Sequence, residues 1–231
     1  MIPLKDSNPT ERFPIITVVF ITLNILVVLY QASLDDDTVE SFVGAFSLVP
    51  ARLFHAGTVL PGQVPVGITI VTSQFLHGGL FHLTGNMLYL WIFGNNVEDA
   101  MGRFRFIVFY LLCGATASVA HALMNAQSNI PMIGASGAIS GILGAYVLLY
   151  PKARVLTLFT LGFFVRLIEV PAMMVLGFWF VLQFLNALVA QGAGGVAWYA
   201  HIGGFIAGMA FILVFKRSDV LLWGKRRYRN Q

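Results

Sequence analysis

Charged residues are scarce in this sequence. They make up 10% of its 231 residues, whereas hydrophobic residues make up 58%. A typical soluble domain carries about 25% charged residues. A water-soluble fold of this length cannot bury so much apolar side chain, so the composition excludes a soluble globular protein. It indicates that lipid is the solvent for much of the protein surface.

The few cations lie in short connections between apolar runs and at the carboxyl end, not along one face of a soluble helix. The formal net charge of +4 therefore gives no reason to expect nucleic acid as a partner. A basic tail suits an anionic membrane surface instead. The cations of this tail are Lys225, Arg226, Arg227 and Arg229.

Two further absences narrow the chemistry. Cys113 is the single cysteine, which excludes an internal disulfide and a cysteine-based zinc site, and its apolar surroundings indicate a small buried side chain. The zinc-protease pattern HExxH does not occur. We therefore expect neither a metal nor a cofactor.

Six apolar runs are each close to the ~20 residues that a helix needs to cross hydrocarbon. The first is longer than the ~7–15 apolar residues of a signal peptide, so we interpret it as a retained span. The expected spans are 13–32, 81–97, 104–124, 134–150, 171–190 and 199–216. Another apolar stretch, 155–165, is too short to cross, and we expect it to rest in the interface or pack under the bundle.

The distribution of cations predicts the orientation of these spans. Six spans place both termini on one side, and all but one of the 14 Lys and Arg residues fall on that side, leaving Arg52 opposite. The positive-inside rule then predicts a short cytoplasmic N-terminus at 1–12 and a basic cytoplasmic tail at 217–231. The segment 33–80 is then outside, and we predict one amphipathic helix on the outer leaflet over Phe42–Phe54.

The expected fold is a single all-α membrane domain over residues 1–231. No Asp or Glu lies in the middle of any span, which excludes the paired aspartates of an intramembrane aspartyl protease and disfavours a proton-coupled pump. Strongly polar groups do occur in the first turns of the second, fourth and sixth spans. These spans run in the same direction, so their polar groups should share one depth, a little below the outer surface. The groups are His82 and Asn86, which share a helix face, Ser136 and His201.

Small residues on the fourth and sixth spans predict that these two helices pack closely, because small faces let membrane helices approach backbone to backbone. On the fourth span, Ser140 and Gly144 lie on the same helix face as Ser136, and Gly137 and Gly141 lie beside that face. On the sixth span, Gly204 and Gly208 lie on the same helix face as His201. The serine and the histidine are therefore expected on facing surfaces.

This arrangement permits acyl transfer. A serine hydroxyl becomes an effective nucleophile when a base takes its proton, and His201 is the candidate base for Ser136. The spans offer no acidic third member, so we predict a dyad. His82, Asn86 and the backbone amide of Ser136 are candidate donors to an oxyanion. Each residue alone has a simpler structural explanation, and we expect His121 to be structural and His55 to be solvated.

The chain resembles the rhomboid intramembrane serine proteases over nearly its whole length. His77-Gly-Gly-Leu-Phe-His82-Leu-Thr-Gly-Asn86 is similar to the family's HxxxN segment with its preceding histidine. Gly134-Ala-Ser136-Gly137 is similar to the nucleophile motif GxSG, and Ala200-His201-Ile-Gly-Gly204-Phe-Ile-Ala-Gly208 to the last helix, which bears the base. Val97-Glu98-Asp99 followed by Gly102 and Arg103 also fits the family.

The resemblance implies a rhomboid-like bundle of six helices in the basic prokaryotic form, located in the plasma membrane. It implies Ser136 as nucleophile, His201 as base, and His82 and Asn86 in the oxyanion site. Three residues would support the site without touching the reacting atoms: His77, Gly134 and Ser140. The implied partners are transmembrane protein substrates and membrane lipid, and the implied gate is the fifth span with the loop 191–198. The oligomeric state is not implied.

Two departures from the family pattern leave one question open. Some members place an aromatic residue against the catalytic histidine, where this chain has Ser140. Some carry a Trp-Arg pair in the outer loop, but residues 33–80 contain no Trp. What positions His201 is therefore not predicted.

Two other function classes stay open. A catalytically silent relative could bind membrane proteins in quality control, although such relatives usually lack the serine or the histidine. A small channel or transporter is disfavoured by the lack of buried carboxylates and of paired inverted halves.

Overall fold

A computed structural model describes residues 1–54, 62, 64–162, 164–189 and 196–224. The cations of the basic tail, His55 and most of the loop 191–198 lie outside the described residues. Among the described residues, four helices are long and apolar enough to cross a membrane. They are α1 (Ile15–Ala32), α7 (Arg103–Met124), α9 (Ala172–Val189) and α10 (Trp198–Phe215).

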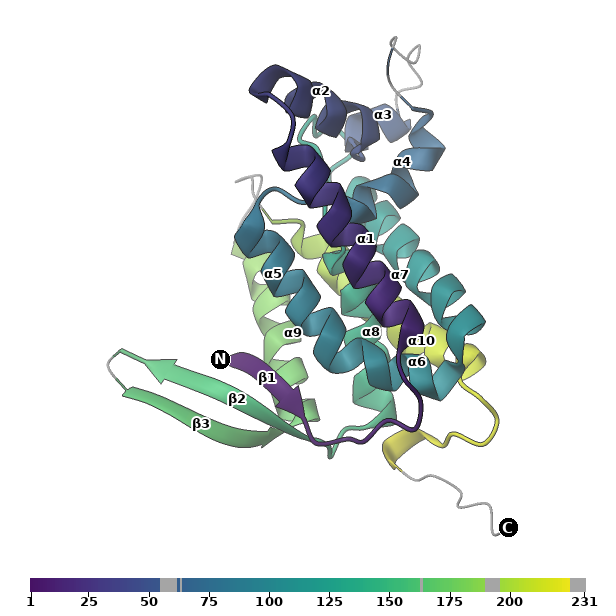
Figure 1. The fold of residues 1–231 in the computed structure, drawn as a ribbon, viewed down its shortest axis with the longest axis vertical. Helices are drawn as coiled ribbons and strands as arrows, with labels where there is room; N and C mark the ends of the chain where they lie inside the picture. The colour runs from purple at the N-terminus through teal and green to yellow at the C-terminus, as the bar shows by residue number, and fades with distance from the viewer. Residues whose placement is uncertain (55–61, 63, 163, 190–195, 225–231) are drawn as a thin grey trace.

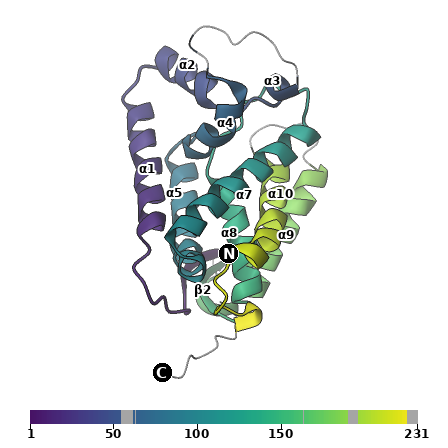
Figure 2. The same ribbon diagram turned by 90° about the vertical axis from the view of Figure 1, so that its right-hand side faces the viewer.

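A fifth apolar helix, α8 (Ser136–Leu149), lies inside the bundle (Figure 1), and almost all of its residues are buried. Figure 2 shows α1 at one edge of the molecule and α9 and α10 at the other. The helix is thus surrounded by protein, which explains why its sequence is rich in small residues and carries no charge.

A continuous helical run over residues 80–101 corresponds to the second expected span. It consists of α5 (Leu80–Tyr89), the π-helical turn η2 (Leu90–Gly94) and α6 (Asn95–Met101). At Gly94 a Cβ atom would press on Leu90 and on Thr17 of α1. The missing side chain therefore lets α1 approach this run closely.

Buried Glu98 anchors the start of α1 from this neighbouring run. Its carboxylate accepts hydrogen bonds from the backbone N–H of Ile16 (3.0 Å) and of Thr17 (2.8 Å), and from the Thr17 hydroxyl (2.8 Å). Pro14, at the N-cap of α1, provides no side-chain acceptor. A carboxylate at this position satisfies free N–H groups and complements the positive end of the helix dipole.

The prediction of one helix over Phe42–Phe54 is wrong. The structure has α2 (Asp36–Phe46), then an extended link, and then α3 (Pro50–Phe54). Pro50 has no N–H to continue a preceding helix, and buried Leu48 in the link pairs with Met132. The segment 33–80 also contains α4 (Val66–Thr72) and the 3₁₀ turn η1 (Ser73–Phe75).

The all-α expectation omitted a small sheet. The strands β1 (Ile2–Asp6), β2 (Arg154–Leu161) and β3 (Phe164–Pro171) form an antiparallel sheet in that order, and the apolar stretch 155–165 lies in its hairpin. In the register, Leu158 faces both Ile2 and Leu167. Figure 1 shows the hairpin projecting sideways from the end of the bundle opposite α2. Asp6 fastens the sheet to this end, because it accepts hydrogen bonds from Tyr146 (2.6 Å) and Asn96 (2.8 Å).

Close packing of α8 against α10 is confirmed. A Cβ atom on Gly204 would collide with the carbonyl of Gly137, and one on Gly208 with the carbonyl of Gly141. The helices thus touch along their backbones, which brings their first turns together.

Gly208→Ala is expected to lower the stability of the protein by about 2–3 kcal/mol, because the backbone of α8 cannot move aside as a side chain can. Gly177 on α9 is the matched control, since a Cβ atom there would meet nothing within 4 Å. Gly177→Ala should be neutral or stabilising by up to about 1 kcal/mol. Thermal unfolding in detergent measures both, and equal midpoints would contradict the close contact.

Candidate functional site

The side chains of Ser136 and His201 are hydrogen-bonded to each other. Ser136 is the first residue of α8, and His201 lies in the first turn of α10. The Ser136 Oγ and the His201 Nε2 are 2.9 Å apart. Both residues line a cavity of about 1040 Å³. Two residues distant in sequence thus form the contact that a nucleophile and its base require.

Gly134 sets the backbone path into Ser136. Its φ of +120° lies in a region that residues with a side chain rarely adopt. A Cβ atom here would also lie 2.8 Å from the Nε2 and Cε1 atoms of the His82 ring. The residue therefore has to be glycine for two reasons, and the second shows how near His82 lies to the segment before Ser136.

Backbone hydrogen bonds from the segment 33–80 hold the segment before Ser136 in place. Leu48 and Met132 exchange two bonds (3.2 and 2.7 Å), and the N–H of Gly134 donates to the carbonyl of Ser73 (2.9 Å). The N–H of Ala51 donates to the carbonyl of Ser128 (3.0 Å). The segment 33–80 thus holds the chain before Ser136 in place, a contact that the sequence did not reveal because backbone bonds leave no side-chain pattern.

His82 and Asn86 lie in the same cavity as Ser136. The His82 Nδ1 accepts a hydrogen bond from the N–H of Gly78 (3.5 Å), which favours the tautomer with the ring proton on Nε2, the nitrogen nearer to Gly134. The Asn86 side-chain amide donates to the carbonyl of His82 (3.1 Å) and has a second N–H. Both residues can therefore offer donors to the cavity.

His77 lies behind His82 and does not line the cavity. Their rings are 5.0 Å apart and nearly perpendicular. Gln31 of α1 holds the backbone of His77 through two hydrogen bonds (3.2 and 3.3 Å). Burial, with a smaller contribution from His82, lowers the pKa of His77 to about 4. A neutral ring packed against His82 fits the supporting role that we predicted.

Ser140 does not contact His201 through hydrogen bonding, since its hydroxyl donates to the carbonyl of Ser136 at 2.6 Å. Instead, the side-chain oxygen of Gln183 lies 2.7 Å from the His201 Nδ1. The rings of Trp179 and Trp198 lie 5.8 and 6.2 Å from the imidazole. Gln183 was not predicted as a site residue, although a glutamine in an expected membrane span is the kind of polar residue that marks a functional site.

Among the described residues, no acidic side chain lines the cavity. No group of three or more His, Cys, Asp or Glu side chains within them could hold a metal ion. His121, which we expected to be structural, does line the cavity.

A comparison with protein families decides the identity of the fold. The model of the rhomboid domain matches residues 66–218, a range that contains both members of the hydrogen-bonded pair. The chain belongs to the rhomboid family. The resemblance seen in the sequence is therefore confirmed, together with a membrane location and a mostly helical fold.

Curated relatives of this rhomboid protein include one bacterial protein and several that are named as mitochondrial. Rhomboid protease GluP of Bacillus subtilis is 33% identical over 157 residues, which cover 68% of this chain and 28% of that protein. Rhomboid protein 1, mitochondrial, of Saccharomyces cerevisiae is 32% identical over 62% of this chain and 40% of its own length. RHOMBOID-like protein 6, mitochondrial, of Arabidopsis thaliana is 32% identical over 70% of this chain and 47% of that protein. The chain thus matches less than half the length of each.

Proposed function

We propose that this rhomboid protein is an intramembrane serine endopeptidase that cleaves transmembrane protein substrates. The observation that carries the proposal is the contact of 2.9 Å between the Ser136 Oγ and the His201 Nε2 in a cavity. A silent relative that only binds membrane proteins has no need of this pair. The relatives include a protein named as a rhomboid protease, which agrees with the proposal.

The proposed reaction follows the general path of serine acyl transfer. The Ser136 Oγ attacks the scissile carbonyl carbon while the His201 Nε2 takes the hydroxyl proton. His201 then gives this proton to the leaving amine, and the C–N bond breaks to leave an ester on Ser136. A water molecule, activated by His201 in the same way, hydrolyses the ester and restores the serine.

Three donors are proposed to stabilise the oxyanion: the N–H of Ser136, the ring of His82 and the amide of Asn86. The first lies at the start of α8, where the N–H groups have no partner within the helix. The side-chain donors border the same cavity. Donors that are already in place when charge develops give the largest single contribution in many acyl-transfer enzymes.

Asn86→Ala is expected to lower kcat by about 10²–10³-fold with a smaller effect on KM, because the donor acts on charge that develops in the transition state. Asn95, outside the cavity, provides the amide control, and Asn95→Ala should retain most activity. The measurement is steady-state cleavage of a transmembrane substrate in detergent. An unchanged kcat in Asn86→Ala would remove this residue from the oxyanion site.

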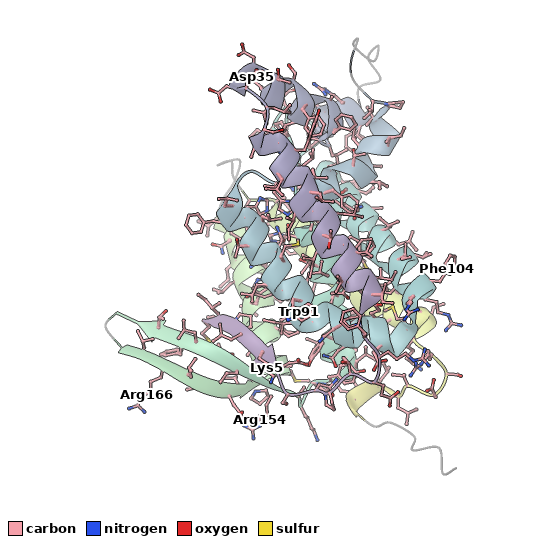
Figure 3. The ribbon with its side chains drawn as sticks, viewed as in Figure 1. Lys5, Asp35, Trp91, Phe104, Arg154 and Arg166 are labelled. Atoms are coloured by element: carbon pink, nitrogen blue, oxygen red, sulfur yellow. The ribbon has the colours of Figure 1, made fainter. Side chains whose placement is uncertain are left out.

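We further propose six spans: α1, the run 80–101, α7, α8, α9 and α10. At ~1.5 Å per residue, α8 is about 21 Å long, shorter than the ~30 Å hydrocarbon layer, so it can begin with Ser136 below the outer surface. In Figure 3, Asp35 lies at one end of the molecule, and Lys5, Arg154 and Arg166 lie at the other. This separation supports cytoplasmic termini.

The proposed location is a prokaryotic plasma membrane, with lipid around the bundle. Exposed Trp91 and Phe104 lie nearer the end of the molecule that carries the cations (Figure 3), as expected of aromatic residues at a membrane surface.

A cleavage assay tests the proposed function. The purified protein in proteoliposomes should cut at least one member of a panel of single-span substrates within or next to its apolar segment, as located by mass spectrometry of the products. Absence of cleavage across the panel, with a folded protein, would favour the silent relative.

A further inference from the structure

We propose that Gln183 on α9 is a positioning residue for the base: its side-chain oxygen holds the His201 imidazole in the tautomer that leaves Nε2 free to accept the proton of Ser136. The inference rests on the proposed function and deepens it. It adds an uncharged third member to the Ser136–His201 pair.

The two nitrogens of the His201 ring have different partners. Nε2 lies 2.9 Å from the Ser136 Oγ, and Nδ1 lies 2.7 Å from the Gln183 Oε1. Both residues are nearly inaccessible, with exposed fractions of 7% for Gln183 and 9% for His201. A carbonyl oxygen can only accept, so the ring proton has to be on Nδ1. The lone pair of Nε2 then faces the serine hydroxyl.

A local hydrogen bond favours this direction of the Gln183 amide. Its Nε2 donates to the carbonyl of Trp179, one turn earlier on α9, at 3.4 Å. In the reverse orientation, the Gln183 Oε1 would face the carbonyl oxygen of Trp179, and the two oxygens would repel each other. The side-chain N–H of Gln183 would then face the His201 Nδ1. The local bond to Trp179 therefore keeps the oxygen directed at the imidazole.

Aromatic rings restrict the remaining freedom of the imidazole. The Trp179 ring lies 5.8 Å from it at an angle of 39°, and the Trp198 ring lies 6.2 Å away and nearly perpendicular. Trp179 and Gln183 are four residues apart and share one face of α9. One helix thus provides both a ring contact and a hydrogen bond to the base, at the place where Ser140 offers neither.

A neutral partner suits this depth. An ionised carboxylate among buried groups in a membrane is costly, and none of the described acidic residues lines the cavity. An amide oxygen selects the tautomer without that cost, although it stabilises the imidazolium less than a carboxylate does. The contribution of Gln183 is therefore orientation of the ring, which predicts a moderate rather than a complete loss when it is removed.

The position of α9 then controls the base. The helix exposes most of its surface, including Phe178, Val181 and Leu185, and Gln183 lies on its buried stripe with Leu176 and Ala187. His201 is oriented only while this stripe packs against α10. A change in how α9 packs would release Nδ1 and uncouple the ring from the serine.

Gln183→Met tests the inference, because methionine keeps the length of the side chain and removes the acceptor. We expect kcat for a transmembrane substrate to fall about 10-fold, with KM within about twofold of the wild type. Asn186→Met is the matched control, since Asn186 is an exposed amide on the same helix and does not line the cavity. A wild-type kcat in Gln183→Met, or an equal loss in Asn186→Met, would each overturn the role.

The tautomer provides a readout that needs no activity. With ¹⁵N-labelled histidine, the resonances that vanish in His201→Asn identify this ring. In the wild type they should report a proton on Nδ1, and in Gln183→Met a mixture of the two tautomers. A proton on Nε2 in the wild type would overturn the inference.

The two proposals can fail separately. If the wild type cleaves nothing, the proposed function fails, and the tautomer still tests the role of Gln183. If Ser136→Ala abolishes cleavage and Gln183→Met has no effect, only the positioning role fails.

Discussion

Ser136→Ala is expected to abolish cleavage of transmembrane substrates, with a loss in kcat of about 10⁶-fold. The reason is that the attacking oxygen is removed while the cavity and the packing of α8 stay intact. The measurement is the appearance of product fragments from a single-span substrate in proteoliposomes, followed long enough to detect residual turnover.

A serine outside the cavity provides the control for this change. Ser33, exposed at the end of α1, is the matched position, and Ser33→Ala should cleave at the wild-type rate. Thermal unfolding should not distinguish Ser136→Ala from the wild type by more than a few degrees. Cleavage that persists in Ser136→Ala at more than a trace level would show that another group is the nucleophile.

His201→Asn is expected to have an effect of similar size, about 10⁶-fold in kcat, because the serine hydroxyl then keeps its proton. A fluorophosphonate probe reports this step without a substrate. In the wild type, the Ser136 Oγ is expected to displace fluoride from the probe and to become phosphonylated while His201 takes the proton. Labelling measured by in-gel fluorescence should disappear in His201→Asn.

His121→Asn is the matched control for the probe, since His121 lines the same cavity without a hydrogen bond to Ser136. It should retain labelling. If His201→Asn labels as fast as the wild type, or if His121→Asn loses labelling while His201→Asn keeps it, the base has been assigned to the wrong histidine.

The four long helices could be predicted from the sequence to within two residues at each described end. The expected spans 13–32 and 104–124 correspond to α1 and α7. This accuracy has a simple cause, because a run of about 20 apolar residues has few alternatives to a helix in a membrane. Shorter segments carried no such constraint. The stretch 155–165 forms a hairpin, and Phe42–Phe54 divides at Leu48, because a short apolar pattern fits strand, helix or link.

The sequence by itself determined that this is a membrane protein, that α8 and α10 pack on their small faces, and that Ser136 and His201 stand in facing first turns. These conclusions follow from composition, from the length of apolar runs and from residues at helical spacing, all of which are local properties of the chain. The tertiary structure alone decided which group contacts the Nδ1 of His201 and which groups hold the segment before Ser136. The contact from Gln183 to His201 depends on how α9 is rotated about its axis against α10, and no local pattern specifies that rotation. The bonds from Leu48 and Ser73 to the segment before Ser136 use backbone groups, which every residue carries, so they have no signature in the sequence.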